Sequence, residues 1–333
     1  MEENRNNIDT RLEQKLGFDR IRKAVADRCA TEYAVNRTME ETFSTDAGTI
    51  RERLLLTDEM RLILMFEESF PSGGYIDCIG FLKLLERPAS YINLVSLRKL
   101  RTMLETVKKI SVFFSSLKDG IYPCLKRMAG PVLYFPEVLS RIDALLDRFG
   151  EIRDSASEEL ASIRRALKDT EGTISRRAGS ILRKMQEDGL ADKDASVSVR
   201  DGKLLIPVPS VNKRKIPGFI YDESASGKTA FIEPAELVEL DNRIKELKFA
   251  ENREILRILM EFSDFLRPYI QDLLYTAEYM GEMDFIMSKA NVALDIVAGM
   301  PILSSTGEMS IRKARHPLLE KALKREKKEI VPL

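Results

Sequence analysis

Seven basic residues between positions 193 and 228 have side chains that suit phosphate binding. They are Lys193, Arg200, Lys203, Lys213, Arg214, Lys215 and Lys228. Exposed lysine and arginine side chains make the sequence-independent contacts of proteins with nucleic-acid backbones. The basic run itself has no interleaved aromatic residue, which argues against a platform for stacking single-stranded bases. The cluster therefore predicts phosphate contacts without base readout, and an ordinary solvated loop is the alternative for so short a run.

Two further motifs could do chemistry, and we expect neither to do so. Ser226-Gly227-Lys228-Thr229 matches the end of a phosphate-binding loop, but that loop requires a glycine where this chain has Asp222, and a helix after the threonine. His316 is the only histidine, so a metal site with two imidazole ligands is excluded. We expect no catalytic residue, no metal and no cofactor in this chain.

Composition and charge indicate a globular cytoplasmic protein. With 333 residues, 44% of them hydrophobic, the chain can bury more than one structural unit. Its 53 basic and 53 acidic residues cancel, so any attraction to nucleic acid must come from a local patch. The three cysteines are far apart in the sequence and odd in number, which favours reduced thiols in a cytosolic protein over disulfide bonds. Neither an apolar leader nor a run of about 18 apolar residues is present, so we expect no membrane partner.

The spacing of apolar residues predicts two long helices around the basic cluster. From Val138 to Met185 apolar residues recur every three or four positions, which is the helical period. This predicts one uninterrupted helix over 137–192, about 80 Å long. A second stripe that begins at Leu237 predicts a helix over 234–268, which returns antiparallel to the first and covers its apolar face.

The segment 193–233, between these helices, predicts a small antiparallel sheet. Residues 196–206 alternate in polarity around Asp201-Gly202, a strong hairpin signal because both turn residues tolerate positive φ. We expect further strands at 217–221 and 229–232, and we expect the sheet to cap the two helices.

The remaining residues predict a helical core. Short amphipathic helices separated by turn signals fill 1–136, and the helical pattern of 269–300 is expected to rejoin them. Residues 301–333 end on an apolar strand-like piece, which we interpret as the truncated start of another domain. The expected fold class is mainly α: a helical core domain and two long antiparallel helices forming a coiled-coil-like arm, capped by a small antiparallel β segment.

This order of elements resembles the MutS family of DNA repair ATPases, and most closely its bacterial MutS-II branch. The residues that carry the resemblance run from Gly218 to Asn242 and include the string SASGKTAFIEPAELVELDN from Ser224. Supporting matches are Leu16-Gly17-Phe18-Asp19-Arg20-Ile21 and Arg315-His316-Pro317-Leu318. The resemblance covers nearly the whole chain, and it implies a core, a first lever helix, a clamp at 193–233 and a second lever helix.

The resemblance also implies a function for the clamp and its surroundings. The family would form homodimers that encircle branched or recombination-intermediate DNA and suppress recombination, with the seven cations contacting phosphates. ATP and Mg²⁺ would bind an ATPase domain that starts within 301–333 and continues past Leu333, and this branch usually adds an Smr endonuclease domain. Pro209 departs from the pattern, since relatives tend to carry a basic residue there.

Two alternatives remain open at the level of sequence. The same clamp could hold ribosomal RNA at stalled or collided ribosomes, because phosphate contacts do not distinguish RNA from DNA unless a 2′-hydroxyl is read. The β segment could instead be a hinge that dimerises two coiled-coil arms.

Overall fold

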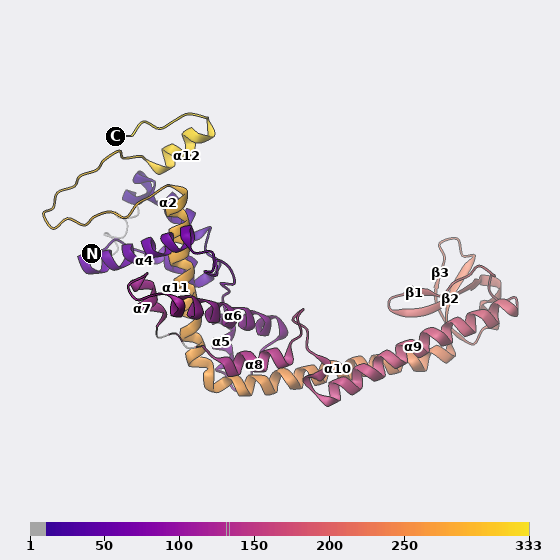
Figure 1. Ribbon diagram of the computed structural model, residues 1–333. Helices are drawn as coiled ribbons and strands as arrows, with labels where there is room; N and C mark the ends of the chain where they lie inside the picture. The colour runs from indigo at the N-terminus through magenta and orange to yellow at the C-terminus, as the bar shows by residue number, and fades with distance from the viewer. Residues whose placement is uncertain (1–10, 131, 133, 333) are drawn as a thin grey trace. The chain divides into compact units, whose positions relative to one another are not determined.

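The computed structural model describes residues 11–130, 132 and 134–332, and the chain divides into two compact units. Unit 1 holds the residues up to Ile142 and those from Ser263 onward, and unit 2 is Asp143–Phe262. The predicted fold class is confirmed, because long and short helices account for most of the chain and the strands form one four-stranded antiparallel sheet (Figure 1). Among the described residues, no helix has both the length and the apolar composition needed to cross a membrane.

Unit 1 is helical. Its elements are α2 (Phe18–Ala26), α3 (Glu32–Glu40), α4 (Ala47–Phe66), α5 (Ile79–Leu85), α6 (Leu94–Ser116), α7 (Pro123–Ala129), most of α8 (Pro136–Leu145), α11 (Ile270–Asp295) and α12 (Pro317–Arg325). Helix α11 contacts each of α2 to α6 and is buried along most of its length. Helix α3 packs closely on α11 at Gly281, where an added Cβ would lie 2.3 Å from the Tyr33 ring.

A buried carboxylate of α11 fixes the start of α3. The Oδ2 atom of Asp284 accepts hydrogen bonds of 2.8 Å from the amides of Ala30 and Thr31 and from the Thr31 hydroxyl. The same hydroxyl accepts from the Ala34 amide as the N-cap of α3. Burial raises the pKa of Asp284. The Asp284 carboxylate thus accepts from backbone amides at the start of α3 that have no acceptor within the helix.

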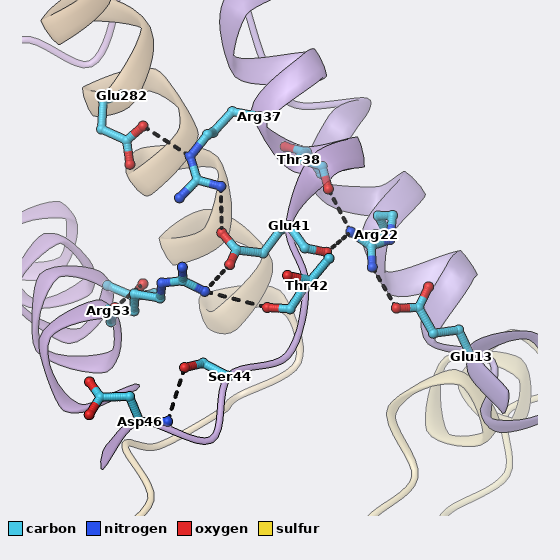
Figure 2. Close-up of polar contacts among 11 residues, drawn as sticks. Glu13, Arg22, Arg37, Thr38, Glu41, Thr42, Ser44, Asp46, Arg53 and Glu282 are labelled. Carbon is cyan, nitrogen blue, oxygen red and sulfur yellow. Dashed lines mark hydrogen bonds and ion pairs between the residues drawn. The ribbon is translucent and has the colours of Figure 1, made fainter. Parts of the chain in front are cut away.

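The other end of α3 is closed by an arginine of α2. Arg22 donates from Nη1 to the carbonyl oxygens of Thr38 and Glu41, each at 2.7 Å, and from Nη2 to the Glu13 carboxylate at 2.6 Å (Figure 2). These carbonyls have no partner within the helix, so the guanidinium acts as a C-terminal cap.

Ion pairs join α3 to its neighbours on the same side of unit 1. Figure 2 shows Arg37 between Glu41 and Glu282, at 3.0 and 3.5 Å, and Arg53 of α4 paired with Glu41 as well. The carboxylate of Glu41 therefore lies between two guanidinium groups, which holds the connection between α3 and α4 in place.

Unit 2 consists of two long helices and the sheet. Its elements are η1 (Asp154–Ala156), α9 (Glu158–Glu187), β1 (Ser198–Arg200), β2 (Lys203–Pro209), η2 (Ser210–Lys215), β3 (Gly218–Glu223), β4 (Thr229–Pro234) and α10 (Ala235–Leu266), whose last residues belong to unit 1. Helices α9 and α10 lie side by side in Figure 1 and run antiparallel, because Arg164 pairs with Glu251 at 2.7 Å and Arg177 with Glu236 at 2.6 Å. The predicted covering of the first stripe by the second is confirmed by a shared apolar cluster of Ile174, Ala178, Leu237 and Ile244.

The prediction of one uninterrupted helix over 137–192 is wrong. Helix α8 ends at Leu145 and α9 begins at Glu158, with twelve residues between them, so the first long helix of unit 2 has 30 residues and is about 45 Å long. Asp147 forms a turn by accepting two backbone amides, at 2.8 and 2.9 Å, and Gly150 adopts a φ of 80°. Ser157 then caps α9. Apolar residues keep their spacing through this break, because Ile152 is still buried, so periodicity alone does not reveal it.

The sheet follows the predicted strands, with the order β1-β2-β4-β3 and every pair antiparallel. The hairpin at Asp201-Gly202 is confirmed, with φ values of 48° and 77°. One face packs on the end of α9 through an apolar cluster that includes Leu182, Met185, Ile206, Val208, Ala230 and Ile232. Gly218 is required by close packing, since an added Cβ would lie 2.3 Å from the Glu233 carbonyl oxygen.

Replacing Asp284 by alanine should lower the free energy of unfolding of unit 1 by about 2 to 4 kcal/mol, because two backbone amides and a hydroxyl lose their acceptor in a buried site. Urea unfolding followed by far-UV circular dichroism measures the change. Asp295→Ala on the same helix removes an exposed carboxylate paired with Arg28 and should change stability by less than about 1 kcal/mol. Equal effects of the two substitutions would contradict the capping role of Asp284.

Lys289 of α11 makes the stability of unit 1 depend on pH. Its ammonium lies 4.2 Å from the centre of the Phe285 ring, and burial lowers its pKa to about 8 despite the nearby carboxylates of Glu41 and Glu282. Between pH 8 and 10 the unfolded chain binds a proton that the folded chain has released, so stability rises with pH. We expect the free energy of unfolding of the protein, minus that of the Lys289→Met variant, to rise by about 1 to 2 kcal/mol from pH 7 to pH 10. Urea unfolding at the two pH values measures this difference. A difference that is the same at both pH values would contradict this.

Candidate nucleic-acid interface

Two loops leave the sheet at the same end. Strand β2 ends and β4 begins at the paired residues Pro209 and Thr229, and β3 ends beside Ala230. The loops 210–215 and 224–228 therefore emerge together, away from the Asp201-Gly202 hairpin.

Hydrogen bonds join these loops to each other and to the loop after α9. The Ser210 amide donates to the Lys228 carbonyl at 2.9 Å, and the Ser210 hydroxyl donates to the Gly227 carbonyl at 2.6 Å. The Asn212 side chain donates to the Leu190 carbonyl at 3.2 Å. Three loops that are separate in sequence thus meet at one end of the sheet.

The loop after α9 is itself held in shape by Gln186. Its side-chain amide lies 3.1 Å from each of the carbonyl oxygens of Asp192, Lys193 and Ala195. Lys193 is exposed on this loop, so its backbone is fixed while its ammonium group stays in solvent.

Five of the seven predicted cations lie on these loops, and we call them the basic end of the sheet: Lys193, Lys213, Arg214, Lys215 and Lys228. Lys213 pairs with Glu223 at 2.6 Å, and Lys215 donates to the Asn212 side chain at 3.1 Å. In the part of the chain that the structure describes, Lys193, Arg214, Lys215 and Lys228 are exposed and form no ion pair. Four cations at this end are therefore available to an external anion.

Arg200 is not part of the basic end. It lies on β1 next to the hairpin, pairs with Asp222 of β3, and places its guanidinium carbon 3.5 Å from the centre of the Phe231 ring of β4. Because it reaches across the sheet to both strands, its charge is used within the fold.

Lys203 is likewise engaged inside unit 2. It pairs with Glu233, whose side chain is only 5% exposed, and lies 5.5 Å from the centre of the Tyr221 ring. The Tyr221 hydroxyl in turn donates to Asp201 at 2.7 Å. A carboxylate this deeply buried needs its cation, so Lys203 stabilises the sheet.

Aromatic rings lie beside the two predicted cations that are outside the basic end, Arg200 and Lys203. Phe231 lies under Arg200 and Tyr221 lies near Lys203, while Phe219 on the edge strand is 64% exposed. Neighbouring strands bring together side chains that are far apart in the sequence, so linear spacing could not show these pairs.

The two other motifs have structural roles. After Ser224 the chain makes a turn, with the Gly227 amide 2.7 Å from the Ser224 carbonyl, and Thr229 then begins a strand, so the Gly-Lys-Thr string does not precede a helix. His316 caps α12 and accepts from the Leu319 amide through Nδ1 at 3.5 Å. Across the described residues, no three histidine, cysteine, aspartate or glutamate side chains converge as metal ligands would.

Curated proteins named Endonuclease MutS2 are similar to this chain over nearly its whole length. The protein of Listeria innocua is 32% identical over 315 residues, which are 94% of this chain and 40% of the relative. That of Thermomicrobium roseum is 32% identical over 322 residues, and that of a Geobacillus strain is 28% identical over 315 residues. The chain spans about 40% of the length of these relatives. No family model matches it.

Substitutions should separate cations that hold the sheet together from those that do not. Lys203→Ala leaves the buried Glu233 carboxylate unpaired and should destabilise unit 2 by about 2 to 4 kcal/mol. Lys215→Ala removes an exposed cation without an ion pair and should change stability by less than about 0.5 kcal/mol. Hydrogen exchange at the amides of β4 measures both effects, and equal protection in the two variants would contradict the assignment.

Proposed function

This chain is a member of the MutS-II family over the part of its relatives that it spans, and we propose that the basic end of its sheet binds the phosphate backbone of nucleic acid. In the family's terms the sheet is the clamp, and α9 and α10 are the levers that carry it. The proposed contacts are made to phosphates and carry no sequence information.

One observation carries this proposal: loops distant in sequence are hydrogen-bonded into a single surface on which four cations form no ion pair with any residue that the structure describes. Lys193, Arg214, Lys215 and Lys228 are exposed there. Four uncompensated cations on fixed loops repel one another, and a phosphate backbone is a ligand that relieves this repulsion while releasing its own counterions.

The other three predicted cations have secondary parts in the proposal. Lys213 pairs with Glu223 on the exposed surface, where ion pairs are weak, so it can exchange that partner for a phosphate. Lys203 stabilises the sheet through the buried Glu233, and Arg200 is engaged by the exposed Asp222 and by the Phe231 ring. We assign direct phosphate contact to the basic end and a supporting role to these two.

For the whole protein we propose a homodimer that closes around branched or recombination-intermediate DNA and so suppresses recombination. The relatives are named endonucleases, and we place ATP hydrolysis and any nuclease chemistry in regions of the relatives outside the span of this chain. Within this chain we propose binding and no catalytic residue. The levers would transmit a nucleotide-dependent movement to the clamp.

Ribosomal RNA is the second candidate ligand, because the same four cations would bind its phosphates equally well. A hinge in which two sheets dimerise is the third. The exposed apolar side chains of β3, Phe219 and Ile220, are the observation that favours it. These candidates differ in measurable ways, since only the hinge requires self-association without nucleic acid.

The salt dependence of binding tests the proposal. Affinity for a four-way DNA junction is measured against salt for the protein and for a variant with Lys193, Arg214, Lys215 and Lys228 replaced by alanine. Each lost contact should flatten the log–log slope by about 0.9, so the variant should be shallower by about 2 to 4.

A matched control replaces Arg51, Lys83, Lys109 and Lys118, which are exposed in unit 1, and should leave the slope unchanged. An equal slope for both variants would place the ligand elsewhere. Tighter binding of a structured RNA than of the junction, lost in the first variant alone, would favour ribosomal RNA. Self-association that depends on Phe219 and persists without nucleic acid would favour the hinge.

A further inference from the structure

A second basic groove lies in unit 1. It is formed by α2, the end of α11 and α12, and encloses about 760 Å³. Its lining includes the apolar side chains of Val292 and Leu318, and basic side chains belong to the helices on either side. This volume is within the range of small-molecule and cofactor sites, about 300 to 1,000 Å³.

The charges of the groove are only partly compensated. Two of its lining cations have partners, because Arg28 pairs with Asp295 and Lys324 with Glu320. Arg20 and Lys23 of α2 and Lys321 and Arg325 of α12 are exposed and form no ion pair with any residue that the structure describes. Three carboxylates, of Asp27, Asp295 and Glu320, also line the groove, so its six lining cations exceed its carboxylates by three.

The unpaired cations form two short rows. Arg20 and Lys23 are three residues apart on α2, and Lys321 and Arg325 are four apart on α12, spacings that place side chains on one face of a helix about 5 to 6 Å apart. All four line the groove, so the rows belong to its two helical walls.

From this geometry we propose that the groove binds neighbouring phosphate groups of one chain, either a single nucleic-acid strand or a free oligophosphate. Two guanidinium groups match phosphate oxygens in bidentate fashion, and the two ammonium groups add point charges. The apolar lining leaves room for sugar or base without competing for the phosphates. This site is separate from the basic end of the sheet, and the proposal does not depend on the function proposed for that surface.

The test uses the variant that lacks Lys193, Arg214, Lys215 and Lys228, so that binding at the sheet does not contribute. In that background Arg20, Lys23, Lys321 and Arg325 are replaced by alanine, and a matched control replaces Arg51, Arg87, Lys83 and Lys109. Fluorescence anisotropy of a labelled deoxythymidine oligonucleotide across a salt series is the first measurement. The groove variant should lose at least tenfold in affinity, and its slope should flatten by about 1.5 to 3, since each single-strand contact contributes about 0.7.

Protection from acetylation locates the ligand. Lys23 and Lys321 should be shielded from an acetylating reagent when the oligonucleotide is bound, while Lys109 should react as before. Circular dichroism checks that the variants stay folded. A Lys23→Gln, Lys321→Gln variant removes two of the four charges and leaves the two arginines in place. Its log–log salt slope should flatten by about half as much as that of the four-residue variant.

The competitors identify the source of the phosphates. Inorganic triphosphate that displaces the oligonucleotide at equal phosphate concentration would assign the groove to free oligophosphates, and failure to displace it would assign the groove to a nucleic-acid strand. The proposal is overturned if the groove variant and the control bind alike, if Lys23 and Lys321 stay reactive, or if a polyglutamate peptide competes better than triphosphate, since that result would point to an acidic protein.

Discussion

Unit 2 depends on the mutual covering of two apolar stripes. Neither α9 nor α10 could remain a stable helix of 30 residues or more with its apolar face in water, because most of the stability of such helices comes from packing. Antiparallel pairing buries Ile174, Ala178, Leu237 and Ile244 in one seam. The sheet then packs on the last turns of α9 through Leu182 and its neighbours, so the loops at the basic end are held by a scaffold and are not left as free tethers.

In unit 1 the equivalent constraint is that backbone amides and carbonyls at helix ends must find hydrogen-bond partners. Helix α3 has nine residues, too few to be stable alone. Asp284 accepts at its start and Arg22 donates at its end, and these two side chains come from different helices. The helix therefore exists because α2 and α11 are in place, and the ion pairs of Arg37, Glu41 and Arg53 strengthen that dependence.

The basic side chains of unit 2 fall into two groups that composition does not distinguish: those paired within the fold and those exposed without an ion pair. Lys203 offsets the buried Glu233 carboxylate, where a missing partner would be destabilising, and Arg200 pairs with the exposed Asp222 while lying against the Phe231 ring. Arg214 and Lys228 lie exposed on fixed loops and form no ion pair within the described part of the chain. Since the net charge of the chain is zero, the proposed affinity for anions depends on surfaces of this second kind.

The sequence alone determined the helical stripes, the Asp201-Gly202 hairpin and the presence of a basic cluster, because each depends on residues close together in the chain. It could not determine the interruption before α9, since buried Ile152 preserves the apolar spacing across a turn made by Asp147. Nor could it divide the seven cations into paired and unpaired ones, or place α2 beside α12, whose residues are almost 300 positions apart. Those outcomes depend on which distant side chains meet when apolar faces are buried, and only the tertiary structure decides that.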